Sequence, residues 1–307
     1  MEIDWKRAWY FISQILSILG FVFFGLLVSQ FLALYIGQQA FKYDYNRASE
    51  IISNPALDAS QAMFLRLFQM LTNFGTFALP VFMYLKVYKY PMMGTLKLRK
   101  FISPLQFIYI SVFAFAALFG LSLLSDLNHN IPLPEKFKLA AEQMDEAQQK
   151  VISGMMFMPS LMHFLANILV VGVVAAFSEE LMFRGLLQPL FKNWTKNIHL
   201  GILISAALFS AIHFDVSNFI PRMAIGVAFG YLFYWSGSLW ITILAHFLNN
   251  SIEVFIYYFK DHNSWCNYFI EVKYFPVVWG LASLVVTLGI LYLFKKKHES
   301  TANHDTV

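Results

Sequence analysis

The sequence predicts an all-α fold: a polytopic membrane helix bundle with about eight transmembrane helices. Hydrophobic residues make up 58% of the 307 residues, and charged residues only 13%. Soluble domains carry about 25% charged residues, so this chain has about half the charge needed to cover a water-facing surface. Apolar runs of about 20 residues, the length that crosses about 30 Å of hydrocarbon, recur along the whole chain.

Reading the apolar runs against the polar breaks between them gives eight candidate helices. They cover residues 8–36, 63–87, 101–125, 157–191, 197–214, 218–235, 238–259 and 274–294. The fourth is long for a single span. The sixth contains Gly226-x-x-x-Gly230, a spacing that permits close helix packing.

The placement of charge predicts how the bundle is oriented. Basic residues follow the second, fourth and eighth helices: Lys86, Lys89, Lys97, Arg99, Lys100, Lys192, Lys196, Lys295, Lys296 and Lys297. The loop after the third helix instead carries acidic residues: Asp126, Glu135, Glu142, Asp145 and Glu146. Under the positive-inside rule both termini are cytoplasmic, as an even number of spans requires. The N-terminus lacks the short apolar core and cleavage site of a signal peptide, so the first helix is expected to be retained.

The chain divides into three predicted regions: N-terminal helices with an external amphipathic segment (1–156), a core (157–260), and a final helix with a polar cytoplasmic tail (261–307). Apolar residues at helical spacing in 135–151 predict a helix on the membrane or over the bundle mouth, with a solvated linker as the alternative. The tail 298–307 is expected to be disordered. The single cysteine, Cys266, excludes an intrachain disulfide and a cysteine-rich metal site. Basic residues flank apolar spans instead of lining a groove, so no nucleic-acid partner is expected.

Six polar residues inside the predicted spans are the candidate site: Glu179, Glu180, Arg184, His213, His246 and Asn250. An ionisable group inside a membrane costs about 2.5–3.5 kcal/mol on insertion scales, so its presence points to function. Glu180 and Arg184 are spaced i, i+4 and can neutralise one another, whereas Glu179 is rotated by about 100°. His246 and Asn250 are also i, i+4. A purely structural buried ion pair remains the alternative.

A depth estimate indicates that these groups can meet. At 1.5 Å per residue, Glu179 lies about 20 Å and His213 about 24 Å along their helices. His246 and Asn250 lie about 12 Å and about 18 Å along theirs. All four fall near the middle of the membrane.

Three motifs in this order resemble the signature of the CPBP family, the CaaX-protease and bacteriocin-processing (Abi) membrane proteases that include the Ras-converting enzyme. They read Glu179-Glu180-Leu-Met-Phe-Arg184, Phe209-Ser-Ala-Ile-His213 and His246-Phe-Leu-Asn-Asn250. The run Phe183-Arg184-Gly185 is also similar to the family's FRG. Each motif alone is weak, but three in the right order are strong together. The resemblance covers about residues 160–258, so the core 157–260 is expected to be a CPBP-like catalytic core.

The resemblance implies an eight-helix membrane endopeptidase that hydrolyses peptide bonds. Glu179 and His213 are expected to activate water, with Glu179 as general base. His246 and Asn250 are expected to donate to the oxyanion, and Glu180 and Arg184 to hold their helix in position. Either no cofactor is required, the favoured alternative, or Glu179, His213 and His246 bind a zinc ion as in a metalloprotease.

Two other classes of function remain open, a proton-coupled transporter and a non-catalytic membrane scaffold, because both could use the same Glu and His residues. Against a transporter, the sequence shows no inverted repeat. The expected partners are the lipid bilayer and a membrane-associated peptide or protein substrate. The composition suggests a bacterial cytoplasmic membrane protein, with a bacteriocin or signalling precursor as the kind of substrate expected there.

Overall fold

The computed structural model describes residues 5–131, 134–271 and 276–304, and every structural statement below concerns these residues. Within them the regular structure is helical, with no strand. The helices are α1 (Trp5–Ile36), α2 (Tyr45–Ser53), α3 (Ala59–Asn73), α4 (Leu79–Val87), α5 (Met92–Thr95), α6 (Pro104–His129), α7 (Glu135–Met155), α8 (Leu161–Asn167), α9 (Ala175–Glu180), α10 (Gln188–Thr195), α11 (Ile198–Ala211), α12 (Phe219–Ser236), α13 (Leu239–Phe259), α14 (Ser264–Glu271) and α15 (Val277–His304). The predicted all-α bundle is confirmed.

Six helical stretches of the described chain are long and apolar enough to cross a membrane: Trp5–Phe41, Ala59–Val87, Pro104–His129, Leu161–Thr195, Leu239–Phe259 and Val277–Ser300. Each contains or overlaps one of the predicted spans. The other two predicted spans correspond to α11 and α12. With 14 residues, α11 extends only about 21 Å. The polytopic architecture is therefore confirmed, while the number of eight crossings stays a prediction.

Three of these stretches contain π-helical segments, which the apolar pattern did not predict, and the first stretch ends in one of them, Gly37–Phe41. Phe74–Ala78 joins α3 to α4, and Ile168–Val174 and Leu181–Leu187 lie on either side of α9. The long fourth span is thus one continuous helix with two wider stretches around Glu179 and Glu180. Such π-helical turns are rare in proteins overall, but those that occur are often found at functional sites.

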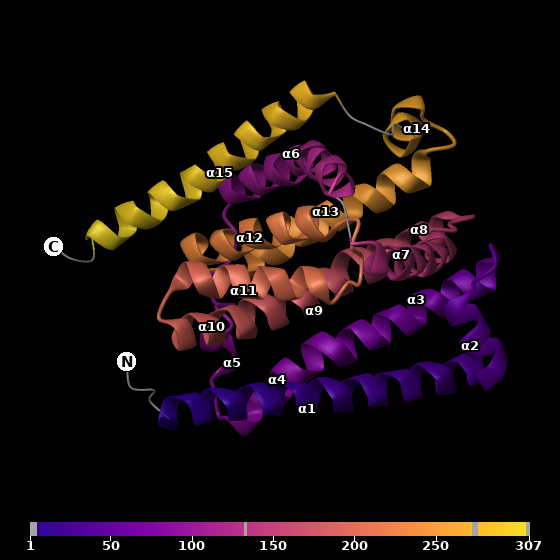
Figure 1. Cartoon of the computed structure of the whole chain (residues 1–307), viewed down its shortest axis with the longest axis horizontal. Helices are drawn as coiled ribbons and strands as arrows, with labels where there is room; N and C mark the ends of the chain where they lie inside the picture. Colours follow the sequence, from indigo (N-terminus) through magenta and orange to yellow (C-terminus); the bar gives the residue numbers. More distant parts are fainter. Residues whose placement is uncertain (1–4, 132–133, 272–275, 305–307) are drawn as a thin grey trace.

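The helices form a layered bundle (Figure 1). Helices α1, α3 and α4 lie along one side of it, α6 and α15 pack together on the other, and α9 to α13 lie between them. Both ends of the described chain lie at the same end of the bundle, on the left in Figure 1. There Arg7 Nη2 of α1 donates to the carbonyl of Asn193 at the end of α10, at 2.8 Å. This arrangement agrees with an even number of crossings, and the cytoplasmic assignment stays a prediction.

Glycines allow two close helix crossings that position the site. A Cβ on Gly25 of α1 would overlap the carbonyl oxygen of Gly75, so the backbones of α1 and the π-helical segment Phe74–Ala78 touch. On α12, a Cβ on Gly230 would lie 2.7 Å from Cγ2 of Ile202. The close packing predicted for Gly226-x-x-x-Gly230 is therefore confirmed, against α11.

Helix α7 confirms the helix predicted in 135–151, but its buried face differs from the predicted one. The apolar residues whose spacing predicted this helix are Phe137, Ala140, Met144, Ala147 and Val151. Of these, Ala140, Met144 and Ala147 are exposed, Val151 is half-buried against residues of α2 and α3, and the side chain of Phe137 lies outside the described residues. The buried residues are instead Ala141, Gly154 and Met155, and Met155 packs in one cluster with residues of α2 and α3. One residue shifts a helical face by about 100°, and apolar periodicity alone does not detect such a rotation.

The prediction of a disordered tail from 298 is wrong for the part of it that the structure describes. Helix α15 continues to His304, and Lys295 Nζ pairs with Glu299 Oε1 one turn later at 3.7 Å. Charged residues at i, i+4 spacing support a helix beyond its apolar part.

Candidate active site

Five of the six predicted site residues come from two helices that pack against each other. Glu179 and Glu180 end α9, and Arg184 lies in the following π-helical segment. His246 and Asn250 lie on α13, one turn apart. Helix α13 packs on α9 and on the π-helical segment before it, so the two motifs face each other.

The predicted pairing of Glu180 with Arg184 is confirmed. Arg184 Nη1 donates to Glu180 Oε1 at 2.6 Å, and both side chains are at most 1% exposed. Arg184 Nη2 donates to the carbonyl of Gly226 at 3.0 Å. The guanidinium also lies over the rings of Phe209 and Phe229, at 4.7 and 5.4 Å from their centroids. A buried charge is tolerable only when paired and hydrogen-bonded in this way.

The imidazole of His246 faces both glutamates. Its Nδ1 lies 3.0 Å from Glu180 Oε1, and its Nε2 lies 3.8 Å from Glu179 Oε2. The ring is buried and has Phe209 and Phe229 as aromatic neighbours. The helical rotation of Glu179 relative to Glu180 thus does not separate them, because one histidine lies within reach of both.

Glu179 is buried, and its Oε1 accepts a hydrogen bond from Asn73 Nδ2 at 3.1 Å. Sequence reasoning missed Asn73, which belongs to no motif and lies more than 100 residues away. The available signal was a polar amide inside the predicted span 63–87, but Arg66 and Gln69 of the same span gave a signal of the same kind.

His213 does not lie inside a helix, as the predicted range 197–214 required. Helix α11 ends at Ala211, and Phe214, three residues later, has a left-handed φ of 52°. His213 is half-buried in the resulting turn, and its Nδ1 lies 2.7 Å from the carbonyl of Phe209. A carbonyl only accepts, so Nδ1 donates and the neutral ring leaves Nε2 as an acceptor.

The turn that carries His213 is held by polar contacts from neighbouring elements. Asn128 Nδ2 of α6 donates to the carbonyl of Val216 at 2.9 Å, and Arg222 of α12 pairs with Asp215 at 2.9 Å. The hydroxyl of Ser217 also donates to Asp145 of α7. Helix α7 is therefore tied to the same turn as His213.

Asn250 is half-buried and donates through Nδ2 to the carbonyl of Val171, at 2.8 Å. Val171 lies in the π-helical segment Ile168–Val174. The contact fixes the amide plane of Asn250, and one N–H of the amide group remains for another acceptor.

The residues named as zinc ligands do not fit a metal site as they are arranged. Among the described residues, no three His, Cys, Asp or Glu side chains are grouped so that they could hold a metal ion. The contact of His246 Nδ1 with Glu180 does not bear on this question, because a zinc-binding imidazole commonly donates its other ring N–H to a carboxylate. No chemical step is therefore derived through zinc, and the metal alternative stays a prediction.

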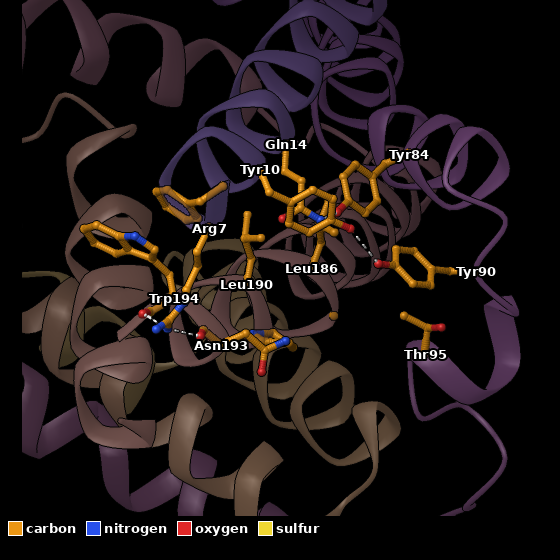
Figure 2. A pocket seen from close by; sticks show the side chains of 13 residues that line it. Arg7, Tyr10, Gln14, Tyr84, Tyr90, Thr95, Leu186, Leu190, Asn193 and Trp194 are labelled. Carbon is orange, nitrogen blue, oxygen red and sulfur yellow. Dashed lines mark hydrogen bonds between the residues drawn. The ribbon is translucent and has the colours of Figure 1, made fainter. Parts of the chain in front are cut away.

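A cavity of about 270 Å³ lies elsewhere, between α1, α4, α5 and α10 (Figure 2). Its walls include Tyr10 and Tyr90, whose hydroxyls lie 3.4 Å apart, and Gln14, which donates to Tyr84. None of the six site residues lines it. The candidate site is thus a set of buried contacting groups rather than this cavity.

The fold and the site define an integral membrane protein with an intramembrane cluster of two glutamates, an arginine and a histidine. Residues 153–252 match the family model described as "Type II CAAX prenyl endopeptidase Rce1-like". This confirms the resemblance predicted from the three motifs, and all six site residues lie in the matched segment. The division of the chain at 157–260 is not tested by the match.

Two curated relatives from Bacillus subtilis (strain 168) align with parts of the chain. The chain is 29% identical over 92 residues to "Uncharacterized protein YpbD", and the aligned segment covers 29% of this chain and 44% of that protein. It is 29% identical over 87 residues to "Putative membrane peptidase YdiL", which covers 28% of this chain and 35% of that protein. The chain thus spans less than half the length of these relatives. No solved structure matches the chain significantly.

Proposed function

We propose that this chain is an intramembrane endopeptidase that hydrolyses a peptide bond in a membrane-associated peptide or protein. The observation that carries the proposal is the position of His246 between two glutamates with different surroundings. Glu180 is neutralised by Arg184, whereas Glu179 contacts a neutral amide and faces the imidazole at 3.8 Å. The family match and the relative named as a peptidase support the same class of activity.

Glu179 acts as the general base. Its Oε1 is occupied by Asn73, so Oε2 accepts a proton from the attacking water. Nε2 of His213 accepts the second hydrogen of that water and orients it. The oxygen then adds to the scissile carbonyl carbon, and the carbonyl π electrons move to the oxygen to form a tetrahedral oxyanion. When the C–N bond breaks, Glu179 returns its proton to the departing amine.

His246 and Asn250 donate to the oxyanion. Because Glu180 accepts from Nδ1, Nε2 of His246 carries a hydrogen only when the ring is doubly protonated. The remaining N–H of Asn250 supplies a second donor beside it. Donors preorganised where charge develops commonly contribute 10²–10³ to kcat, about 2.7–4 kcal/mol each.

Comparing membrane peptides from cells that make the wild-type chain or its Glu179→Gln variant tests this function. The proposal expects one or more membrane-associated peptides to accumulate uncleaved with the variant and to disappear with the wild type. Identical peptide sets, with both proteins inserted and folded, would contradict it. A proton flux lost in Glu179→Gln, without any change in peptides, would instead support the transporter alternative.

We also propose that the chain lies in a bacterial cytoplasmic membrane with both termini in the cytoplasm. Both ends of the described chain lie at the same end of the bundle, where the basic loops also gather. Fusing a reporter that is active only in the cytoplasm to the C-terminus tests this. An active fusion is expected, and an inactive but inserted fusion would reverse the orientation.

A further inference from the structure

Asn73 is the only residue outside the family-matched segment for which a hydrogen bond to Glu179 is observed among the described residues. It is the last residue of α3, and its side chain is 6% exposed. Its Nδ2 lies 3.1 Å from Glu179 Oε1, and its Oδ1 is buried with no hydrogen-bond partner in the described structure. A buried amide that leaves its acceptor unpartnered is costly and calls for an explanation.

The orientation of this amide follows from its neighbour. Rotating the group by 180° would place Oδ1 of Asn73 against a carboxylate oxygen of Glu179, two acceptors without a hydrogen between them. The N–H must therefore face Glu179. The two oxygens of that carboxylate are consequently distinguished, since Oε1 accepts from Asn73 and Oε2 faces His246.

The backbone around Asn73 leaves it little freedom to withdraw. The π-helical segment Phe74–Ala78 begins at the next residue, and on α1 the backbone of Gly25 touches Gly75 of that segment. A glycine in each helix allows this contact, which presses the segment into the bundle. The segment also packs against α9, which carries Glu179.

We infer that Asn73 is a positioning residue for Glu179, an inference that rests on the proposed function of Glu179 as general base. Its N–H holds the carboxylate in the rotamer that presents Oε2 to the water. Oδ1 of Asn73 has no hydrogen-bond partner among the described residues, so no other contact competes for this amide group. The backbone and the hydrogen bond to Glu179 therefore set its orientation.

The other charged groups around Glu179 come from three elements. Glu180 and Arg184 lie on its own helix, His246 on α13, and His213 in the turn after α11. From α3, the contact is the neutral amide of Asn73. Replacing it by aspartate keeps the shape but places a second carboxylate against the first, where both cannot easily ionise.

Asn167→Asp is a matched control. Asn167 is fully buried on the same long helix as Glu179, and its Oδ1 accepts from Arg66 Nε at 2.7 Å. A carboxylate there keeps the Arg66 guanidinium on one oxygen, while its other oxygen replaces the Nδ2 that donates to the carbonyl of Met155 at 2.9 Å, so the unfolding curve of this variant is measured as well. The substitution therefore has the same chemistry in a place where it does not contact Glu179.

Labelling of the full-length chain in detergent with dicyclohexylcarbodiimide, which reacts with protonated buried carboxyl groups, reads the state of Glu179 without requiring a substrate. Fragment-ion mass spectrometry separates Glu179 from Glu180. We expect Asn73→Asp to move the midpoint of Glu179 labelling upward by about one pH unit or more, and Asn73→Ala to move it in the same direction. Asn167→Asp leaves it unchanged. An unmoved midpoint in both Asn73 variants overturns the inference, as does an equal movement in Asn167→Asp.

Cleavage of an internally quenched peptide library by the same preparations separates this inference from the proposed function. Asn73→Ala is expected to lower kcat about 10- to 100-fold with little change in KM, because misplacement of a catalytic group by about 1 Å has such an effect. The acidic limb of the pH profile of Asn73→Asp moves to higher pH. If the wild type cleaves no peptide while labelling shifts as expected, the peptidase proposal fails and the positioning of Glu179 by Asn73 stands.

Discussion

Nδ1 of His246 lies 3.0 Å from Oε1 of Glu180, and the same oxygen accepts Arg184 Nη1 at 2.6 Å. One carboxylate oxygen therefore joins an arginine of its own helix to a histidine of α13. The second oxygen of Glu180, Oε2, is buried with no hydrogen-bond partner among the described residues. Glu180 thus connects two helices in addition to neutralising a charge.

Removing the charge of Glu180 should strongly destabilise the bundle. In Glu180→Gln, the Arg184 guanidinium stays buried without a carboxylate, a situation that costs about 3–5 kcal/mol. Denaturant unfolding in mixed micelles measures the difference. Glu180→Gln/Arg184→Met should recover part of the loss, because no unpaired charge remains.

Glu146→Gln is the control for that experiment. Glu146 is exposed on α7 and pairs with Lys150 at 2.9 Å, a surface interaction of little consequence for stability. Equal stability of Glu180→Gln and the wild type would show that the buried pair contributes nothing.

The crossing of α1 with the π-helical segment can be tested with two glycines of one helix. An alanine at Gly25 would force its Cβ into the backbone of Gly75, which cannot move aside as a side chain can. We expect Gly25→Ala to cost about 1–3 kcal/mol. At Gly20 no atom lies within 4 Å of an added Cβ, so Gly20→Ala should be neutral or stabilise by up to about 1 kcal/mol. Similar effects of both substitutions would be evidence against the contact.

The contact between Asp145 and Ser217 should control the mobility of α7. Asp145→Ala removes the acceptor for the Ser217 hydroxyl and with it a link between α7 and the His213 turn. Faster amide hydrogen exchange is expected in both α7 and residues 212–218, since local opening reflects the contacts that hold a segment. Glu142→Ala, an exposed change on the same helix, should leave the exchange unchanged. If exchange rises in α7 alone, the two segments are not coupled.

Metal dependence is tested by stringent chelation. We expect cleavage to survive chelation and not to rise on addition of zinc, because no three His, Cys, Asp or Glu side chains of the described residues are grouped so that they could hold a metal ion. Activity that disappears with chelator and returns with zinc would reverse this expectation and assign a ligand role to the histidines.

The motifs alone predicted much of the site. The i, i+4 spacing of Glu180 and Arg184 predicted their ion pair. The two side chains form this pair even though Arg184 lies in a π-helical segment rather than in an α-helix. Intramembrane polarity also pointed to His246, and the Gly226-x-x-x-Gly230 spacing to a close crossing. In each case the information is local to one helix.

What the sequence did not predict depends on contacts between helices or on departures from regular helix geometry. Asn73 reaches Glu179 only because the crossing with α1 and a π-helical segment orient the end of α3. The end of α11 before His213 was missed because the run stays apolar to Phe214, while the turn is fixed by polar contacts from α6, α7 and α12. The apolar pattern of one helix does not show which residues of other helices will contact its end.

The role of Glu179 as the general base of a peptidase can be tested directly. The most direct measurement is the kcat of the purified chain and of Glu179→Gln on a peptide that the membrane comparison identifies, with Glu146→Gln as the matched exposed control. We expect Glu179→Gln to lower kcat by at least about 100-fold, while its unfolding curve and that of the control stay close to the wild type. Cleavage by Glu179→Gln at the wild-type rate would contradict it.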